Sequence, residues 1–227
     1  LYDDYYPGML APGETTDRYP AARAAFDLYA GSHNPDTSGV LYYSFSAPGA
    51  DFFVLDTRSY RSPPGSIDNS QKTMLGAVQR EALLDYLEQS DAAFKFIVSS
   101  VPVAPGEASS DTWSGYQTEL ALILAEIEQR AVSGVLFLSG DRHWSGAFRF
   151  VSSGGYAYYD FIPSPAGSNL RTGTAPPMNT DPNQTVIYSA DTFLAFGDFQ
   201  IDLSGATPTL RTAFVDEDGD ERCVITI

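Results

Sequence analysis

The clearest sign of chemistry in this sequence is a polar run, Ser-Gly-Asp-Arg-His-Trp-Ser, at residues 139–145. The run directly follows the apolar residues 135–138, which have the composition of a buried strand. Ligands of open α/β sheets bind beyond the carboxyl ends of the strands. If the chain stays extended here, Asp141 and His143 project to the same side, because alternate residues of a strand share a face. A carboxylate and an imidazole that converge in this way suit a divalent or trivalent cation.

Other interpretations of the same residues stay open at this point. Arg142 would project away from Asp141 and His143, toward a phosphate or a carboxylate. Without a metal, Asp141 would cap the following turn and His143 would pack beside Trp144. A serine-hydrolase triad is disfavoured, because an aspartate two residues from its histidine cannot easily orient the ring, and the chain has no G-x-S-x-G elbow.

Composition narrows the class of protein and of metal site. The 227 residues carry 13 Lys and Arg against 29 Asp and Glu, a formal net charge of −16. Such a surface repels nucleic acid and anionic membranes, so we expect neither as a partner. No apolar run approaches the ~20 residues that a membrane-spanning helix needs. The single cysteine, Cys223, excludes an internal disulfide, and two histidines exclude a multi-histidine centre, which leaves carboxylates as the main metal ligands.

The elements that would position these residues alternate between strands and helices over the first two-thirds of the chain. Short apolar runs predict strands, and apolar residues that recur at three and four positions predict helices. The predicted strands are residues 41–45, 51–56, 94–98 and 135–138, and the predicted helices are residues 19–30, 75–87 and 116–127. This alternation favours an α/β fold built on a layered sheet.

Beyond residue 146 the pattern changes to strands and turns. The predicted strands are residues 146–151, 156–162, 196–203, 208–215 and 222–227. Residues 167–185 are rich in Pro, Gly, Thr and Asn, and we expect a long surface loop there. No internal repeat is visible, so residues 1–227 are expected to belong to one domain, with an α/β part (1–150) and a β-rich C-terminal segment (151–227).

Several blocks of the sequence resemble one protein family. Residues 52–61 read Phe-Phe-Val-Leu-Asp-Thr-Arg-Ser-Tyr-Arg and resemble a hallmark segment of the PhoD-like alkaline phosphatases. Residues 75–79, 111–116 and 139–145 resemble further blocks of that family, in the same order. The resemblance implies a calcineurin-like metallophosphoesterase fold, a β-sandwich flanked by helices. It also implies hydrolysis of phosphate mono- or diesters at a bimetal site, typically iron with calcium, in a secreted or periplasmic enzyme.

The resemblance assigns metal ligands residue by residue. Asp141 and His143 match the family's C-terminal metal-binding pair. Asp3 and Asp4 match the acidic pair that begins its central motif, and Tyr5 stands where that motif usually has a histidine. The alternative for Asp3 and Asp4 is a solvated acidic pair at the end of the chain.

Arginines are the candidates for a catalytic role. The resemblance implies that an arginine stabilises the phosphate oxyanion, and Arg142 and Arg58 are the candidates. Arg58 follows the strand predicted at 51–56, together with Asp56 and Arg61. These three residues could contact a phosphate, or they could form a structural ion-pair network.

The family's early metal motifs would lie upstream of residue 1, and the chain opens without a basic-then-apolar leader. We therefore expect the C-terminal part of a PhoD-like enzyme, which by itself binds metal weakly and hydrolyses little, because a bimetal site needs several ligands. The alternative is a truncated or non-catalytic homologue that acts as a binding or structural module.

Three further features have simpler explanations than a functional site. Trp113 and Tyr116 could line a substrate cleft, or they could be aromatic residues that staple the start of a helix. His33 is expected to be a loop residue rather than a ligand. Residues 216–221 resemble a calcium loop only in their acidity, and an Asp-Gly hairpin turn is favoured there.

Overall fold

The computed structural model describes residues 4–10, 12–29, 39–104, 109–172 and 183–227. Its helices are α1 (Tyr19–Tyr29), α2 (Gly76–Gln89) and α3 (Gln117–Gln129), with a short 3-10 helix η2 (Trp113–Gly115). The strands are β1 (Tyr43–Ala47), β2 (Ala50–Val54), β3 (Phe94–Ser99), β4 (Val135–Ser139), β5 (Ser145–Val151), β6 (Ala157–Ile162), β7 (Gln184–Ala190), β8 (Ala195–Asp202), β9 (Thr209–Asp216) and β10 (Glu221–Thr226). The predicted alternation of strands and helices is confirmed up to β4.

Among these strands, seven form one mixed sheet in the order β1-β2-β3-β4-β6-β5-β7. Strands β2, β3 and β4 are parallel, and Val54, Val98 and Leu138 lie in register across them. Their carboxyl ends therefore meet at one edge of the sheet. The three strands consist mostly of apolar residues, because both faces of the sheet are covered there.

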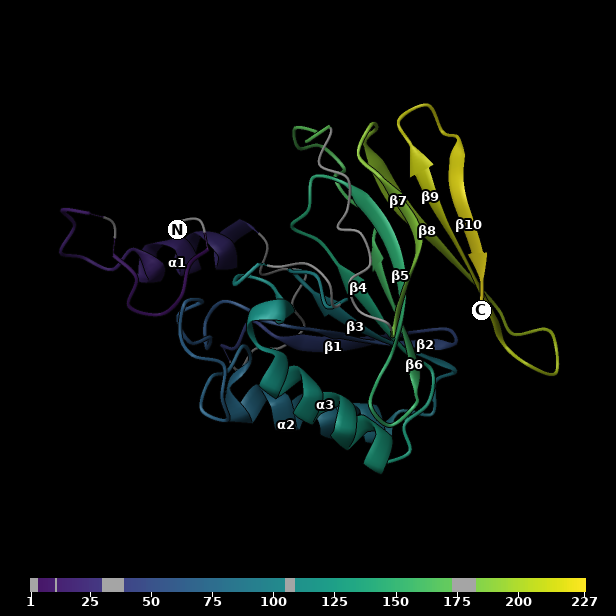
Figure 1. Cartoon of the computed structure of the whole chain (residues 1–227), viewed down its shortest axis with the longest axis horizontal. Helices are drawn as coiled ribbons and strands as arrows, with labels where there is room; N and C mark the ends of the chain where they lie inside the picture. Colours follow the sequence, from purple (N-terminus) through teal and green to yellow (C-terminus); the bar gives the residue numbers. More distant parts are fainter. Residues whose placement is uncertain (1–3, 11, 30–38, 105–108, 173–182) are drawn as a thin grey trace.

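The two faces of the large sheet bury alternate residues of the same strands. Phe53, Ile97 and Phe137 belong to the core cluster that also contains apolar side chains of α2 and α3. These two helices cover that face in Figure 1. The neighbouring residues Phe52 and Phe96 belong to the cluster on the opposite face.

The opposite face packs against a three-stranded sheet of order β10-β9-β8 within the described part of the chain. Phe199 of β8 meets Phe96 and Phe161 edge-on, with ring centroids 5.9 and 5.6 Å away. Leu210 and Phe214 of β9 complete the apolar layer between the two sheets. The expected β-rich C-terminal segment is thus confirmed: β6 and β7 belong to the large sheet, and β8, β9 and β10 form a second layer on it (Figure 1).

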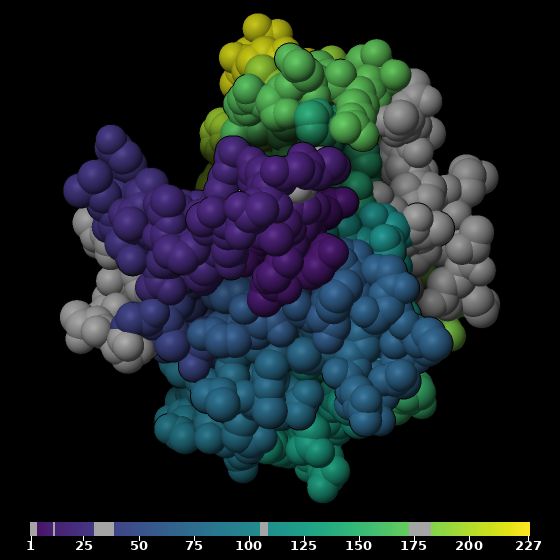
Figure 2. Space-filling view, turned by 90° about the vertical axis from the view of Figure 1, so that its left-hand side faces the viewer, coloured from purple at the N-terminus to yellow at the C-terminus, as the bar shows by residue number. Residues whose placement is uncertain are grey.

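The N-terminal segment lies across the body of the molecule, between the parts coloured blue and green in Figure 2. Tyr5 is only 3% exposed, and its ring stacks on that of Tyr19 at a centroid distance of 5.5 Å. The Tyr19 hydroxyl hydrogen-bonds to the Ser59 hydroxyl at 2.6 Å. Tyr5 and Tyr19 therefore attach this segment to the loop that follows β2.

Two sequence expectations have different outcomes. The loop predicted at 167–185 overlaps β7, which begins at Gln184 and pairs with β5 at the edge of the sheet. That strand was missed because polar residues interrupt its alternation, as an edge strand tolerates. The prediction for His33 falls outside the described residues.

No helix within the described ranges is long and apolar enough to cross a membrane.

Candidate functional site

The candidate site lies where the carboxyl ends of β2, β3 and β4 meet. The loop after β2 is joined to the end of β3 by a hydrogen bond from the Leu55 amide to the Val98 carbonyl at 2.9 Å. The Thr57 and Ser100 hydroxyls form a second bond between the same two loops. This edge is where an open α/β sheet binds its ligands.

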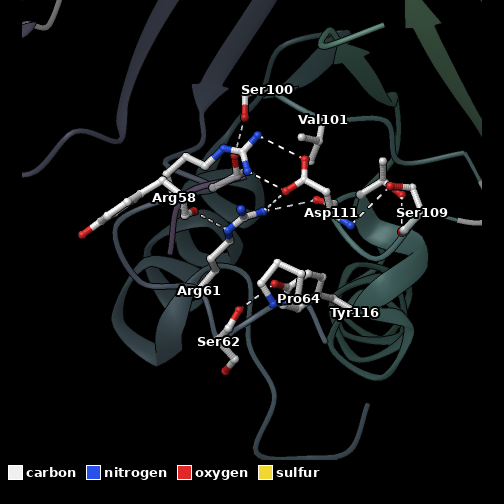
Figure 3. Close-up of polar contacts among 12 residues, drawn as sticks. Arg58, Arg61, Ser62, Pro64, Ser100, Val101, Ser109, Asp111 and Tyr116 are labelled. Carbon is white, nitrogen blue, oxygen red and sulfur yellow. Dashed lines mark hydrogen bonds and ion pairs between the residues drawn. The ribbon is translucent and has the colours of Figure 1, made fainter. Parts of the chain in front are cut away.

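At this edge, one carboxylate is shared by two guanidinium groups (Figure 3). Arg58 donates two parallel hydrogen bonds to Asp111, from Nη1 to Oδ1 at 2.7 Å and from Nη2 to Oδ2 at 3.2 Å. Arg61 donates from Nη1 to the same Oδ1. The three side chains carry a net charge of +1, since two cations share one anion. Of the three residues considered for an ion-pair network, Asp56, Arg58 and Arg61, the two arginines do take part in one, and their partner there is Asp111 rather than Asp56.

Asp111 is placed by the 3-10 helix that follows it. The Trp113 amide bonds to the Pro102 carbonyl at 3.2 Å, and the indole Nε1 donates to the Ser99 hydroxyl at 3.1 Å. Gly115 packs against the chain on the other side, where an added Cβ would lie 2.4 Å from the Ser110 carbonyl oxygen. A larger residue at 115 would therefore displace the backbone that carries Asp111.

Asp56 has a structural role in the loop after β2. Its Oδ1 accepts the backbone N–H groups of Arg58 and Ser59 at 3.0 and 2.9 Å, which is an Asx-type turn. The buried Gln79 side chain in turn accepts the Asp56 amide at 2.7 Å and donates back to its carbonyl. Asp56 and Gln79 thus turn the chain so that Arg58 points over the sheet edge.

The charges at this edge act on one another. Burial alone would raise the pKa of Asp111, but the hydrogen bonds from Arg58 and Arg61 outweigh it and hold this pKa below its ordinary value. Burial lowers the pKa of Arg58, whereas Asp111 and then the charges of Asp141 and Asp4 raise it above its ordinary value overall. Arg58 therefore lies within the field of three carboxylates, two of which are predicted metal ligands.

The loop after β4 is not extended as the sequence analysis assumed. Asp141 adopts a left-handed backbone with φ of 70°, so the chain turns between Asp141 and His143 and the two-residue alternation does not hold. Asp141 is exposed. His143 directs Nδ1 to the Asn169 carbonyl, with the Ser168 hydroxyl 3.2 Å away. Asp4 is also left-handed, with φ of 52°.

The donors for a metal ion are few. Within the described ranges, no three His, Cys, Asp or Glu side chains gather closely enough to hold a metal ion. Asp141, His143 and Asp4 alone thus do not make a complete ligand set.

A second buried aspartate, Asp160 of β6, was missed by sequence reasoning. It is fully buried, and Oδ2 accepts the amides of Val103 and Ala104 at 2.9 and 2.7 Å, while Oδ1 accepts the Ser139 hydroxyl at 2.7 Å. Burial raises the pKa of Asp160, and these hydrogen bonds lower it only in part. Asp160 connects the first residue of the 139–145 run to the loop after β3. Its signal in the sequence is a single carboxylate within an aromatic strand.

The remaining candidates from the sequence, namely Arg142, Trp113, Tyr116 and the acidic run at 216–221, are held by burial or by hydrogen bonds within the fold. Arg142 has Nε and Nη2 shielded from solvent, and its carbonyl accepts the Ser164 hydroxyl. Trp113 and Tyr116 are buried in the core, which favours the structural alternative for both. Asp216 accepts the amides of Asp218 and Asp220 in a turn between β9 and β10, so the predicted hairpin is confirmed.

Comparisons with known proteins relate the sequence and the fold of this chain to one family. Alkaline phosphatase D of Bacillus subtilis (strain 168) is 29% identical in an alignment 116 residues long that covers 43% of this chain and 20% of that protein. A solved structure described as "Structure of PhoD" has a TM-score of 0.65 at 18% identity, a likeness of fold, and the alignment covers 97% of this chain and 52% of that one. This chain therefore spans about half the length of the solved relative. The PhoD-like phosphatase family matches residues 3–204, and this chain belongs to that family.

Proposed function

We propose that this chain forms part of a phosphoester hydrolase whose site lies at the carboxyl edge of β2, β3 and β4. The single observation that carries the proposal is the placement of Arg58 at that edge, where paired hydrogen bonds to Asp111 fix a partly exposed guanidinium. Membership of the PhoD-like phosphatase family supports the reaction class. The substrate would be a phosphate monoester or diester, and the enzyme would be secreted or periplasmic.

Arg58 is suited to bind a phosphate oxygen. A guanidinium has five N–H donors in a planar fork, and two of those of Arg58 are given to Asp111. Its side chain is 27% exposed, so it is partly open to solvent at the edge of the sheet. In this proposal Arg58 would stabilise the oxyanion, with Arg142 as the second candidate for that role.

The finer proposal concerns metal ions, with iron and calcium as the pair that the family resemblance implies. Asp141, His143 and Asp4 would contribute carboxylate and imidazole ligands. Bound metals would supply an activated water nucleophile. Because these residues do not form a complete ligand set, further ligands would have to come from outside the described part of the chain.

A second candidate function is a non-catalytic binding or structural module. The observation that favours it is the incomplete ligand set among the described residues. Tyr5 stands at the position of the expected histidine. It is buried, and its backbone carbonyl accepts a hydrogen bond from Arg61, so its contacts are structural.

Turnover of p-nitrophenyl phosphate by this chain, with iron and calcium added, separates the two functions. We expect slow, metal-dependent hydrolysis that is lost in Asp141→Asn. The matched control is Asp85→Asn, a surface carboxylate of α2 that pairs with Arg130 and should keep the activity. If the chain shows no metal-dependent turnover, or Asp141→Asn retains it, the module is the better description.

A further inference from the structure

The cluster of Asp111, Arg58 and Arg61 joins two parts of the candidate site that belong to different segments of the chain. Arg58 follows β2 at this edge and pairs with Asp111, and Arg61 donates to the Tyr5 carbonyl in the segment that carries Asp4. We infer that Asp111 is a positioning residue, which orients Arg58 toward a phosphate oxygen and, through Arg61, holds the segment that carries Asp4. This inference rests on the proposed function and assigns a role to Asp111 and Arg61 that the family blocks alone do not give.

The geometry of Arg58 supports the first part. A single ionic contact would leave its guanidinium free to rotate, but the paired bonds at 2.7 and 3.2 Å fix the plane of the group. Asp111 can act as a rigid partner because it is buried and held by η2. Its carboxylate thus determines the direction in which the remaining Arg58 donors point.

The surroundings of Arg61 support the second part. Its side chain is 0% exposed, and its Nε donates to the Tyr5 carbonyl at 2.7 Å. Tyr5 directly follows Asp4 in the chain, and Asp4 lies close enough to Arg58 to raise its pKa. One guanidinium therefore connects Asp111 to the backbone beside a predicted metal ligand.

Two explanations of Asp111 predict opposite signs for phosphate binding. If the carboxylate only offsets positive charge, Asp111→Asn should strengthen the binding of phosphate, because the local charge becomes more positive. If the carboxylate orients Arg58, the same change should weaken binding. Asp111→Glu keeps the charge but moves the carboxylate by one methylene, so only the orienting role predicts weaker binding there.

The chain offers a matched control in Glu119. This buried carboxylate pairs with Arg80 at 3.0 Å, and the exposed fractions of that pair are close to those of Arg58 and Asp111. Glu119 also accepts the Thr73 hydroxyl at 2.6 Å and the Met74 amide, just before the start of α2. Glu119→Gln should therefore reduce stability without changing phosphate binding.

The test is a titration of the chain with inorganic phosphate in EDTA at constant ionic strength, followed by the NMR signal of Arg58 Nε–Hε. We expect a saturable shift in the wild type, a dissociation constant raised about tenfold in Asp111→Asn and Asp111→Glu, and little change in Glu119→Gln. The amide exchange of Met9, which bonds to the Tyr6 carbonyl at 3.1 Å, should accelerate only in the Asp111 variants.

Each other result overturns the inference. Stronger or unchanged phosphate binding in the Asp111 variants would mean that the Asp111 carboxylate does not orient Arg58. Equal weakening in Glu119→Gln would mean that phosphate binding follows the overall stability of the protein. Absence of an NMR shift at Arg58 in the wild type would show that Arg58 does not contact phosphate. If Asp111→Asn does not fold, Asp111→Glu decides alone. Because EDTA removes metals, these results are independent of hydrolysis, so failure of the proposed function is detected separately by the turnover assay.

Discussion

Two buried aspartates, Asp111 and Asp160, lie at the same edge of the sheet and have opposite electrostatics. Asp111 is neutralised by the charged groups of Arg58 and Arg61, and its pKa is lowered despite the burial that opposes this. Asp160 receives only neutral donors, from Ser139 and two backbone amides, and burial leaves its pKa raised. The two carboxylates thus differ in the charge of their partners: cationic donors outweigh burial at Asp111, whereas neutral donors offset burial only in part at Asp160.

The difference also separates two tasks. Asp111 forms ion pairs with Arg58 and Arg61 at the sheet edge, the place of the proposed phosphate site. Asp160 adds no such charge and instead connects the loops after β3 and β4 through hydrogen bonds. One aspartate thus sets the electrostatics of the candidate site, and the other sets the path of its backbone.

The largest expected effect is the loss of stability in Asp111→Asn. Removal of one partner of a buried ion pair costs about 3–5 kcal/mol, because the remaining charge is left uncompensated. Here Arg61 would be left in that state, with a side chain that is 0% exposed. Urea unfolding at neutral pH measures the change. A loss as small as that of an ordinary surface substitution would show that the cluster is solvated in solution.

An intermediate effect is expected in the pH dependence of stability, with opposite signs for the two aspartates. The lowered pKa of Asp111 means that its contribution is complete above its ordinary value of 3.8 and is lost as the pH falls through the lowered pKa. The raised pKa of Asp160 means that ionisation costs stability at neutral pH, and this cost disappears as the pH falls from the raised pKa toward 3.8.

Unfolding free energies of the wild type, Asp111→Asn and Asp160→Asn from pH 7 downward test these signs. On acidification, the advantage of the wild type over Asp111→Asn should shrink, while the wild type should gain relative to Asp160→Asn. Slopes of the same sign for both variants would contradict the comparison.

The smallest loss of stability is expected from a substitution of Arg130. At Asp111 one carboxylate pairs with two arginines, whereas at Arg130 one arginine pairs with several carboxylates. Among these carboxylates are Glu81, Asp85 and Glu88 of α2, and all three of these partners are exposed. Solvent screens such pairs, so Arg130→Gln should cost less than either buried aspartate variant. Thermal unfolding in low and 1 M salt measures it. A loss that persists unchanged in 1 M salt would contradict a screened network.

The positions of the site loops could be predicted from the sequence, whereas the pairing of their side chains could not. The apolar runs at 94–98 and 135–138 have the pattern of buried strands and became β3 and β4. The partner of Arg58 lies 53 residues away, in a loop without periodicity, so no local pattern could identify Asp111.

The conformation after β4 also depends on surroundings that a local pattern does not contain. The sequence suggested an extended chain that aligns Asp141 with His143, but Asp141 is left-handed and His143 turns to Asn169. Aspartate tolerates this backbone better than most residues. The loop is held by partners later in the chain: Asp160 accepts the Ser139 hydroxyl, and the Ser164 hydroxyl donates to the Arg142 carbonyl.

The long reach of Arg61 has a consequence for the order in which the molecule assembles. Its hydrogen bonds join residues that are 50 and 56 positions apart, to Asp111 and to Tyr5. Closing loops of this length costs chain entropy before any contact repays it, and such contacts slow folding. The ion pairs can form only once the parallel strands have brought these segments together. A molecule that has not completed its sheet therefore has not yet fixed the guanidinium groups of the candidate site.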